Sequence, residues 1–187
     1  EAARQIGAAL KEKPSYHVVL VKSTVVPGTT SEVVLPIVEE ASGKQAGRDF
    51  GIGMNPEFLR EGEAVQDFLY PDRIVLGGLD ERTLDVLAEL YRPFSNVDQI
   101  RTNPRTAEMI KYASNAFLAT RISFINEIAN MCEEMGADVR EVARGMGMDK
   151  RIGHAFLDAG VGWGGSCFPK DVKALAHMAV LHGTHPQ

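Results

Sequence analysis

The sequence predicts an α/β region followed by an all-α region. Over the first hundred residues, short apolar runs rich in β-branched residues alternate with helical patterns, and the connections between them are short. This alternation is typical of a doubly wound parallel sheet. From residue 103 onward only helical periodicity remains. We therefore expect the later half of a doubly wound domain at residues 1–102 and a helical domain at residues 103–187.

Composition and charge exclude several classes of protein. The 187 residues are 44% hydrophobic and 24% charged, as in an ordinary globular protein, and the net charge of −5 argues against non-specific nucleic-acid binding. No apolar run reaches the ~18 residues of a membrane span. The two cysteines form neither a disulfide framework nor a metal-ligand cluster, so we expect no metal and a reduced, cytoplasmic compartment. The chain starts at Glu1 in a helical pattern without a Met, which indicates a piece of a longer protein.

Two predicted strands are each followed by polar residues. Residues 16–21 are an apolar, β-branched run without alternation, as expected for a strand buried on both faces, and residues 50–54 form a second strand. Ser23-Thr24 follows the first strand and Asn55-Pro56-Glu57 follows the second. Ligands of doubly wound sheets bind beyond the carboxyl ends of the strands, so both segments are candidates for a ligand site.

The helix between these strands carries conflicting signals. Thr29 and Glu32 have the spacing of a capping box, and Gly43 is a typical helix stop. Pro36 lies inside the pattern, where it removes a backbone hydrogen bond, so we expect a bend or a break there. The remaining elements of this region are predicted as the end of a helix at residues 1–13, a strand at 73–76, a helix capped by Asp80 and a strand at 97–101.

One long helix dominates the second region. Asn103-Pro104 supplies an N-cap and a proline at the first helical position, and the helical pattern continues to about Met135 and stops at Gly136. Its middle, residues 116–128, is apolar nearly all round, so it must be covered on several sides. A partner subunit is the simplest cover in so short a chain. Asp138 begins a further helix.

The segment from Gly162 to Asp171 combines three glycines, a thiol, a lysine and a carboxylate within ten residues. Cys167 lies just before a predicted helix start with Lys170 nearby, a setting that favours a nucleophilic thiolate. The alternative is a small buried cysteine in a tight turn. Residues 160–165 also match G-x-G-x-x-G, but they follow no predicted strand, so we interpret them as an active-site loop rather than a pyrophosphate-binding loop.

Two pairs of polar residues recur at the four-residue spacing that places them on one helix face. Lys111 and Asn115 share a largely apolar helix, where the lysine either extends to water or is held for a purpose. Glu57 and Glu61 could provide a general base and a ligand, or simply a solvated helix start.

Four motifs occur together in one order: VKSTVVPG at residues 21–28, NPEFLREG at 55–62, KYASNAFLA at 111–119 and GGSCFPKD at 164–171. In these motifs the sequence resembles the UDP-glucose/GDP-mannose 6-dehydrogenases, and the resemblance covers essentially all 187 residues. The resemblance implies a Rossmann-like NAD domain and a C-terminal nucleotide-sugar domain flanking a helical dimerisation domain. The chain would hold the later half of the first and the central domain, so the isolated chain is expected to be inactive.

The resemblance also implies a reaction, a cofactor and an assembly. The C6 alcohol of a nucleotide sugar would be oxidised by four electrons with NAD as acceptor, UDP-glucose to UDP-glucuronate in the branch that the chain resembles most. Cys167 would hold the substrate as a thiohemiacetal and then as a thioester. A UDP-sugar is the implied substrate, and a homodimer through the long helix is the implied assembly.

Roles for individual residues follow from the same resemblance. Lys111 and Asn115 would stabilise an oxyanion. Asp171 would order a water or take a proton, Glu57 would act as general base in thioester hydrolysis, and Thr24 completes the catalytic set. The cofactor-binding residues would be Ser23, Thr24, Val25, Glu61 and Lys170. The substrate-binding residues would be Glu57, Phe58, Leu59, Arg60, Lys111, Asn115, Arg151 and Gly164.

Three alternatives stay open. The substrate could be GDP-mannose or a UDP-N-acetyl sugar, although Arg151-Ile152-Gly153 and Trp163 look more like the UDP-glucose branch. The chain alone could be a non-catalytic dimerisation module. A cysteine acyl-transfer enzyme without redox chemistry would need a histidine base beside Cys167, and the sequence offers none nearby.

Overall fold

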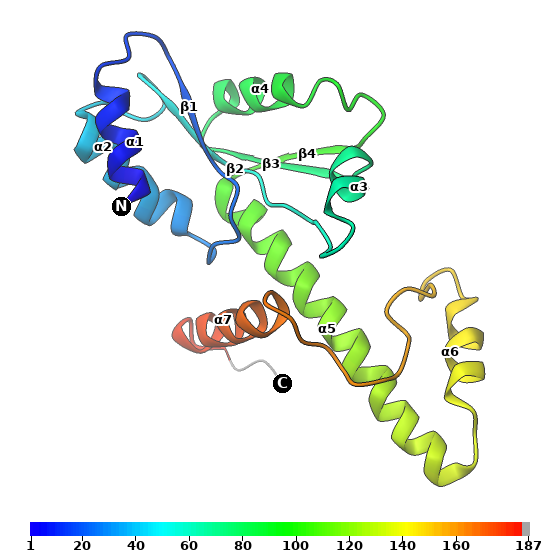
Figure 1. Ribbon diagram of the computed structural model, residues 1–187. Helices are drawn as coiled ribbons and strands as arrows, with labels where there is room; N and C mark the ends of the chain where they lie inside the picture. The colour runs from blue at the N-terminus through cyan, green and yellow to red at the C-terminus, as the bar shows by residue number, and fades with distance from the viewer. Residues whose placement is uncertain (185–187) are drawn as a thin grey trace. The chain divides into compact units, whose positions relative to one another are not determined.

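The computed structural model describes residues 1–184, which form two compact units (Figure 1). Unit 1 runs from Glu1 to Lys111 and unit 2 begins at Tyr112. In chain order, the elements up to the long helix are α1 (Ala2–Lys11), β1 (Val18–Val21), a π-helical segment η1 (Thr30–Val34), α2 (Leu35–Ser42), β2 (Gly51–Met54), α3 (Ala64–Leu69), β3 (Ile74–Gly78), α4 (Glu81–Leu90) and β4 (Gln99–Thr102). They are followed by α5 (Pro104–Met135), α6 (Val139–Gly147) and α7 (Phe168–Leu181).

The predicted α/β class followed by helices is confirmed, including the long helix of 32 residues. The four strands form one sheet in the order β1-β2-β3-β4, with β1/β2 and β3/β4 parallel. The β2/β3 pair is antiparallel and overlaps for only two residue pairs, which differs from an all-parallel arrangement. The connection between these strands contains only α3, a six-residue helix without a buried residue. It therefore does not cover a sheet face as the helix of a parallel crossover does.

Helices cover both faces of the sheet, as Figure 1 shows for α1 and α2 on one side and α4 on the other. The side chains of β2 explain this division because alternate residues point to opposite faces. Ile52 packs in the core beneath α1 and α2, whereas a side chain at Gly51 would lie 2.3 Å from Thr83 of α4. Glycine on this face of β2 therefore lets α4 approach the strand closely.

The helix after β1 begins differently from its predicted form. Thr29 has helical backbone angles, its hydroxyl donates to the carbonyl oxygen of Val26 (2.5 Å), and its side chain does not cap the helix. Glu32 forms an ion pair with Arg105 instead of closing a capping box, so that prediction is wrong. Pro36 was expected to bend or break the helix, but the chain stays helical there: it is π-helical up to Val34 and α-helical from Leu35, with Pro36 in the first turn of α2.

Other predicted helix boundaries are confirmed by their hydrogen bonds. The Asp80 carboxylate accepts from the amide of Thr83 (2.7 Å), and Asp138 accepts from the amide of Arg140 (2.8 Å). Asn103 accepts from the amide of Thr106 (2.8 Å), which satisfies one of the free amides at the start of α5. Gly43 ends α2 in the left-handed conformation, with a φ of 67°.

Unit 2 contains α5 from residue 112 onward, α6 and α7. Three large apolar side chains on α5 are exposed at a spacing of seven residues, Phe117, Phe124 and Met131. Residues seven apart lie on nearly the same face of a helix, so they form one apolar stripe. Across residues 1–184, no helix combines the length and the apolar character that a membrane span requires.

Candidate active site

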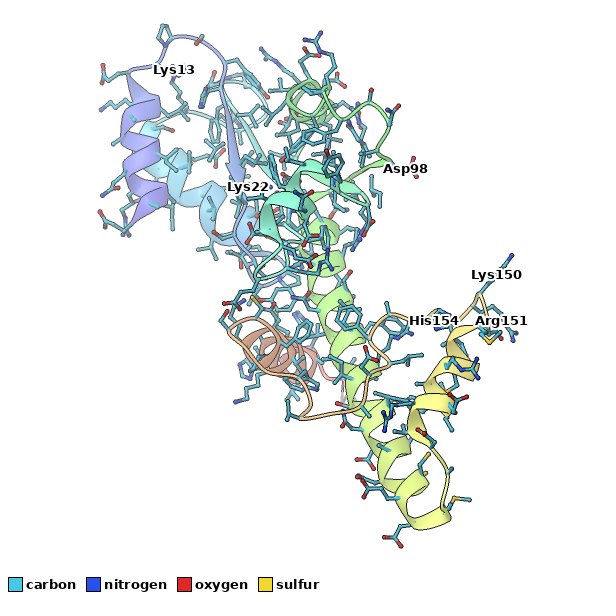
Figure 2. All side chains as sticks on the ribbon, turned by 45° about the vertical axis from the view of Figure 1, so that its right-hand side comes forward. Lys13, Lys22, Asp98, Lys150, Arg151 and His154 are labelled. Carbon is cyan, nitrogen blue, oxygen red and sulfur yellow. The ribbon has the colours of Figure 1, made fainter. Side chains whose placement is uncertain are left out.

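The carboxyl end of β1 leads directly into Ser23, Thr24 and Val25, and a polar network fixes this strand end. Asn55 is 2% exposed; its side-chain amide donates to the carbonyl oxygen of Val75 (2.8 Å), and its side-chain oxygen accepts from Lys22 (2.7 Å). The backbone amide of Asn55 donates to the carbonyl oxygen of Val21 (2.9 Å). Figure 2 shows Lys22 at this end of β1. Asn55 therefore joins the ends of β1 and β2 to β3.

A buried carboxylate fixes the far end of the loop that follows β1. Glu108 on α5 is fully buried. One of its oxygens accepts from the amide of Gly28 (2.6 Å), and the other accepts from the amide (2.9 Å) and the hydroxyl (2.6 Å) of Thr30. The loop that starts with Ser23 and Thr24 is thus held at its end by α5.

Lys111 lies three residues after Glu108 on α5 and is 8% exposed. Its ammonium group is 5.3 Å from the centre of the Phe58 ring, and the guanidinium of Arg73 is 4.0 Å from the same ring. A cation over an aromatic face is attracted by the negative centre of the ring. The structure therefore brings Lys111 next to the segment that carries Glu57 and Phe58.

The rest of this segment is exposed. Glu57, Leu59 and Glu61 all have solvent-accessible side chains. Arg60 is held by Asp67, which accepts from both its guanidinium (2.6 Å) and its backbone amide (2.7 Å). These bonds raise the pKa of Arg60 and lower that of Asp67. Arg60 would have to leave Asp67, or share it, in order to bind a substrate.

In unit 2, Cys167 is exposed and occupies the N-cap of α7. The predicted position just before a helix is confirmed, and the Ser166 hydroxyl is 3.7 Å from the sulfur. In the loop before it, Gly162 and Gly165 take φ values of 89° and 75°, which residues with a side chain rarely adopt. The thiol is therefore accessible to a ligand at a site where free amides of the helix end favour negative charge.

One helical turn after Cys167, Asp171 is the centre of a buried polar cluster. Asp171 is 1% exposed; one oxygen accepts from the side-chain amide of Asn115 (2.7 Å) and the other from the Lys170 ammonium (2.7 Å). The hydrogen bond to Asp171 raises the pKa of Lys170 against the opposing effect of burial, and the charges of Asp171 and Cys167 add to the rise. A carboxylate, an amide and a cation are thus placed together beside the thiol.

The loop between α6 and Cys167 is anchored on α5 by three side chains. The Arg121 guanidinium donates to the carbonyl oxygens of Ile152 and Gly153 (both 2.8 Å). Asn126 accepts from the amide of Gly160 (3.1 Å), and the indole of Trp163 donates to the Ser123 hydroxyl (2.9 Å). Trp163 also packs edge-to-face on Phe168, so within unit 2 it helps to hold the loop.

The two substrate-binding candidates on this loop are both accessible. Figure 2 shows Lys150 and Arg151 projecting from the chain after α6, and the Arg151 side chain is 89% exposed. Arg151 pairs with Asp149 (2.6 Å), and this hydrogen bond raises the pKa of Arg151. Gly164 is exposed, and a side chain added there would meet no atom within 4 Å.

The predicted site residues thus fall into two groups. Unit 1 brings together the loop after β1, the segment after β2 and Lys111, whereas unit 2 brings together Asn115, Cys167, Lys170 and Asp171. Lys111 and Asn115 belong to one continuous helix, one turn apart. Sequence reasoning missed the roles of Asn55 and Glu108. Their only signal was position: Asn55 follows a buried strand, and Glu108 precedes Lys111 by three residues on the same helix face.

No three His, Cys, Asp or Glu side chains in residues 1–184 gather in a way that could hold a metal ion. The G-x-G-x-x-G match at residues 160–165 lies in the loop after α6 and does not follow a strand, as expected for a loop that is not a pyrophosphate cradle. The loop from Ser23 to Thr30, at the carboxyl ends of β1 and β2, has the location and the fixed backbone that suit one end of a dinucleotide.

Comparison with known proteins gives the family. Residues 1–95 match the NAD binding domain of the UDP-glucose/GDP-mannose dehydrogenase family, and residues 105–187 match the central domain of that family. The chain is 52% identical to the UDP-glucose 6-dehydrogenase AglM of Haloferax volcanii, over the whole chain and 44% of that protein. It is 46% identical to the GDP-mannose 6-dehydrogenase of Pseudomonas aeruginosa, over 98% of the chain and 42% of that protein.

A solved structure supports the same assignment. A UDP-glucose dehydrogenase from Pyrobaculum islandicum superposes with a TM-score of 0.92 and 45% identity, over 98% of the chain and 42% of that structure. The chain spans less than half the length of the curated relatives that it matches. Because the two family domains together match nearly all of its residues, the chain belongs to the UDP-glucose/GDP-mannose dehydrogenase family and carries its NAD-binding and central domains.

Proposed function

We propose that residues 1–187 are part of a longer NAD-dependent nucleotide-sugar 6-dehydrogenase that converts UDP-glucose to UDP-glucuronate. The observation that carries the proposal is the cluster around Cys167, an exposed thiol at a helix start with the buried Asp171 one turn away and Asn115 and Lys170 bound to it. Relatives that are UDP-glucose 6-dehydrogenases at about half identity support the reaction and the substrate.

NAD supplies the hydride acceptor for both oxidations. Ser23, Thr24 and Val25 would hold its nicotinamide end, because they follow β1 at the carboxyl edge of the sheet and their loop is fixed at both ends. Lys170 and Glu61 would lie near the same cofactor. The proposed domain division follows the sequence: the later part of the NAD domain at residues 1–102 and the central domain at residues 103–187.

Cys167 would act as the nucleophile. The substrate alcohol loses a hydride and a proton to become an aldehyde, and the thiol adds to its carbonyl carbon to form a thiohemiacetal. Loss of a second hydride and of the hydroxyl proton leaves a thioester, and water then displaces the sulfur to release the carboxylate and a proton and to regenerate the thiol. One alcohol and one water are thus converted to one carboxylate with two hydrides and three protons released. Covalent capture keeps the reactive aldehyde bound between the two oxidations.

Lys111 and Asn115 would stabilise the oxyanion that forms at C6 in each addition step. They lie one turn apart on α5, and both are nearly buried, which strengthens their interaction with charge. Asn115 uses one amide hydrogen for Asp171, which orients the group and leaves its second hydrogen for the substrate. The buried Asp171 carboxylate would thus serve to orient the Asn115 amide.

Three further residues would complete the catalytic set, two of them by handling protons. Asp171 would order a water or accept a proton from the alcohol, Glu57 would act as general base for the water that hydrolyses the thioester, and Thr24 would hold the reacting end of the site. Glu57 is exposed and follows β2 in the segment that Phe58 links to Lys111, so a base there has access to solvent.

The resemblance to the family also implies which residues would bind the sugar nucleotide. Phe58, Leu59 and Arg60 follow Glu57, while Gly164 offers an open backbone next to the thiol and Arg151 an exposed cation for phosphate. GDP-mannose is the alternative substrate, favoured by 46% identity to a GDP-mannose 6-dehydrogenase, and a UDP-N-acetyl sugar is a further alternative.

The protein would act as a cytoplasmic homodimer formed through α5. The stripe of Phe117, Phe124 and Met131 supports this assembly, because three exposed apolar side chains on one helix face are costly in water. For the 187 residues alone, we propose a dimerisation module without catalysis, since the described residues hold no pyrophosphate loop after a strand. Sedimentation of the isolated chain as a monomer would contradict this assembly.

The reaction is tested in the full-length protein that contains these residues. We expect two NADH to form per UDP-glucose. With GDP-mannose and UDP-N-acetylglucosamine, NADH should form more slowly or not at all. Cys167→Ser should form less than about a thousandth of the uronate, since the thioester route is lost. Cys132→Ser is the matched control, because Cys132 is the other cysteine and is buried. Wild-type uronate production by Cys167→Ser would contradict the assignment.

A further inference from the structure

The fully buried carboxylate of Glu108 is the feature that the proposed mechanism does not use. A buried carboxylate is costly unless hydrogen bonds satisfy it. Here all three donors come from one loop, the amide of Gly28 and the amide and hydroxyl of Thr30. Glu108 is therefore specific for this loop rather than a general part of the core.

The loop is held between two fixed points. At its start, the carbonyl oxygen of Val21 accepts from the amide of Asn55 (2.9 Å), and at its end Glu108 binds Gly28 and Thr30. Gly28 takes a φ of 99°, so the chain turns sharply where the carboxylate meets it. Residues 23–25 lie between these points and lose much of their conformational freedom.

Helix α5 connects this loop to the proposed oxyanion donors. Glu108 lies three residues before Lys111 and seven before Asn115, spacings that place the three side chains along one helix face. Any shift of the loop relative to Glu108 is therefore a shift relative to Lys111. A displacement of about 1 Å at a reacting centre is enough to reduce a rate by about a hundredfold.

We propose that Glu108 is a positioning residue. It would hold the loop from Ser23 to Thr30, and with it Thr24, in a fixed position against the face of α5 that carries Lys111. The proposal rests on the proposed function, because the loop matters for rate only if it meets the cofactor. Glu108 does not touch the reacting atoms in this account, and it acts through Gly28 and Thr30.

Glu108→Gln in the full-length protein is the main variant. The side chain keeps its shape, but one oxygen becomes an NH2 group that faces an N–H or O–H of the loop, so at least one donor loses its acceptor. We expect kcat to fall about 10- to 100-fold and the KM for NAD to rise, with the KM for UDP-glucose within about threefold of wild type. The deuterium isotope effect with UDP-glucose labelled at C6 should increase, because hydride transfer becomes slower than product release. Glu40→Gln, at an exposed glutamate of α2, should match the wild type in all four parameters.

Thr30 supplies a conservative pair of variants. Thr30→Ser keeps the hydroxyl that binds Glu108 and should retain wild-type kinetics, whereas Thr30→Val keeps the shape and should show a milder form of the Glu108→Gln defect. A purely structural role would lower the amount of folded Thr30→Val protein without changing kcat or the KM for NAD of the protein that folds.

Amide exchange tests the anchor independently of catalysis. In Glu108→Gln, the amides of Gly28 and Thr30 should exchange at least about tenfold faster, while the amides of Ile52 and Met54 in β2 keep their wild-type rates. Unchanged loop exchange, or an equal increase in β2, would overturn the proposal. Wild-type kinetics in Glu108→Gln with faster loop exchange would overturn it as well. If the wild-type protein oxidises no UDP-glucose, the proposed function fails. The role of Glu108 is then decided by the NAD affinity of Glu108→Gln together with its loop exchange. An unchanged NAD affinity would overturn the positioning role, and a weaker affinity would support it.

Discussion

Helix α5 anchors one loop in each unit, but the two anchors differ in kind. In unit 1, the buried Glu108 carboxylate receives three hydrogen bonds from the loop after β1. In unit 2, the loop that leads to Cys167 is held by Arg121, Ser123 and Asn126, which are exposed or half-buried.

This difference predicts unequal loop stability. When a buried acceptor is removed, its donors cannot turn to water, and each unsatisfied group costs about 1–3 kcal/mol. An exposed donor or acceptor exchanges its partner for water at little cost. We therefore expect the loop with Thr24 to be held in place before any ligand binds, and the loop with Cys167 to adjust when a sugar nucleotide arrives.

The largest effect is expected where unit 2 has its own buried anchor, Asp171. In Asp171→Asn, an NH2 group replaces an oxygen that accepts from Asn115 or Lys170. Two donors then face each other in a buried site, so the free energy of unfolding of this unit should fall by about 1–3 kcal/mol. Activity of the full-length protein should fall about 10²- to 10⁴-fold. Asp158→Asn, at an exposed position of the same unit, is the control.

Urea denaturation and NADH formation measure these two effects. Near-wild-type turnover by Asp171→Asn would remove this residue from the catalytic set, even if its stability fell as expected.

A smaller effect is expected for Arg121→Ala, which removes the donors to the carbonyl oxygens of Ile152 and Gly153. Water can replace both bonds at this half-exposed site, so the free energy of unfolding should fall by only about 1 kcal/mol. The main consequence should be a rise of about tenfold in the KM for UDP-glucose with kcat nearly unchanged, because a looser loop lowers binding rather than the chemical step. Steady-state kinetics check this, and a fall in kcat equal to that of Asp171→Asn would contradict the distinction between the two anchors.

Trp163→Phe should have a still smaller effect. The variant loses one exposed hydrogen bond to Ser123 and keeps an aromatic ring against Phe168. The expected change in stability is about 0.5–1 kcal/mol, measured by urea denaturation followed by circular dichroism. Ser123→Ala removes the same bond from the other side and should give the same value; a clearly larger loss in Trp163→Phe would show that ring packing, not the hydrogen bond, anchors the loop.

The smallest effect concerns pH. The hydrogen bond to Asp171 raises the pKa of Lys170 above its ordinary value of 10.5. The stabilisation of the folded state by the Lys170–Asp171 pair is therefore fully present below pH 10.5. It is lost as the pH rises through the higher pKa that Lys170 has in the folded state. Lys170 is half exposed, so the contribution should be under about 1 kcal/mol. Urea denaturation between pH 8 and 11.5 measures the free energy of unfolding of the wild type and of Lys170→Gln. The difference between these two free energies should shrink above pH 10.5, and a growing difference would contradict this coupling.

Much of the fold was predictable because it depends on local signals. Asp80, Asn103 and Asp138 cap helices as their side chains predict, and Pro36 lies next to the point where the helix changes from π to α. The failures involve partners far away in sequence. Glu32 has the spacing of a capping box but pairs with Arg105, 73 residues later.

The site was predictable to the extent that its motifs are local. Cys167 and Asp171 lie one turn apart at a helix start, which their spacing alone implies. The anchors were not predictable in this way, because a glutamate on a helix normally indicates a solvated face, and only the fold shows that Glu108 meets Gly28 and Thr30, about 80 residues earlier. The antiparallel β2/β3 pair likewise depends on a connection whose helix covers no face of the sheet.

The central claim is that Cys167 carries the substrate as a thioester. The most direct measurement uses the full-length Glu57→Gln protein, in which the proposed base for hydrolysis is absent, mixed with UDP-glucose and NAD and quenched in acid. Mass spectrometry of the peptide around Cys167 should show the sulfur acylated by the oxidised sugar nucleotide, with two NADH formed per acylated site. An unmodified Cys167 in a protein that has formed NADH, or the acyl group on another residue, would contradict the account.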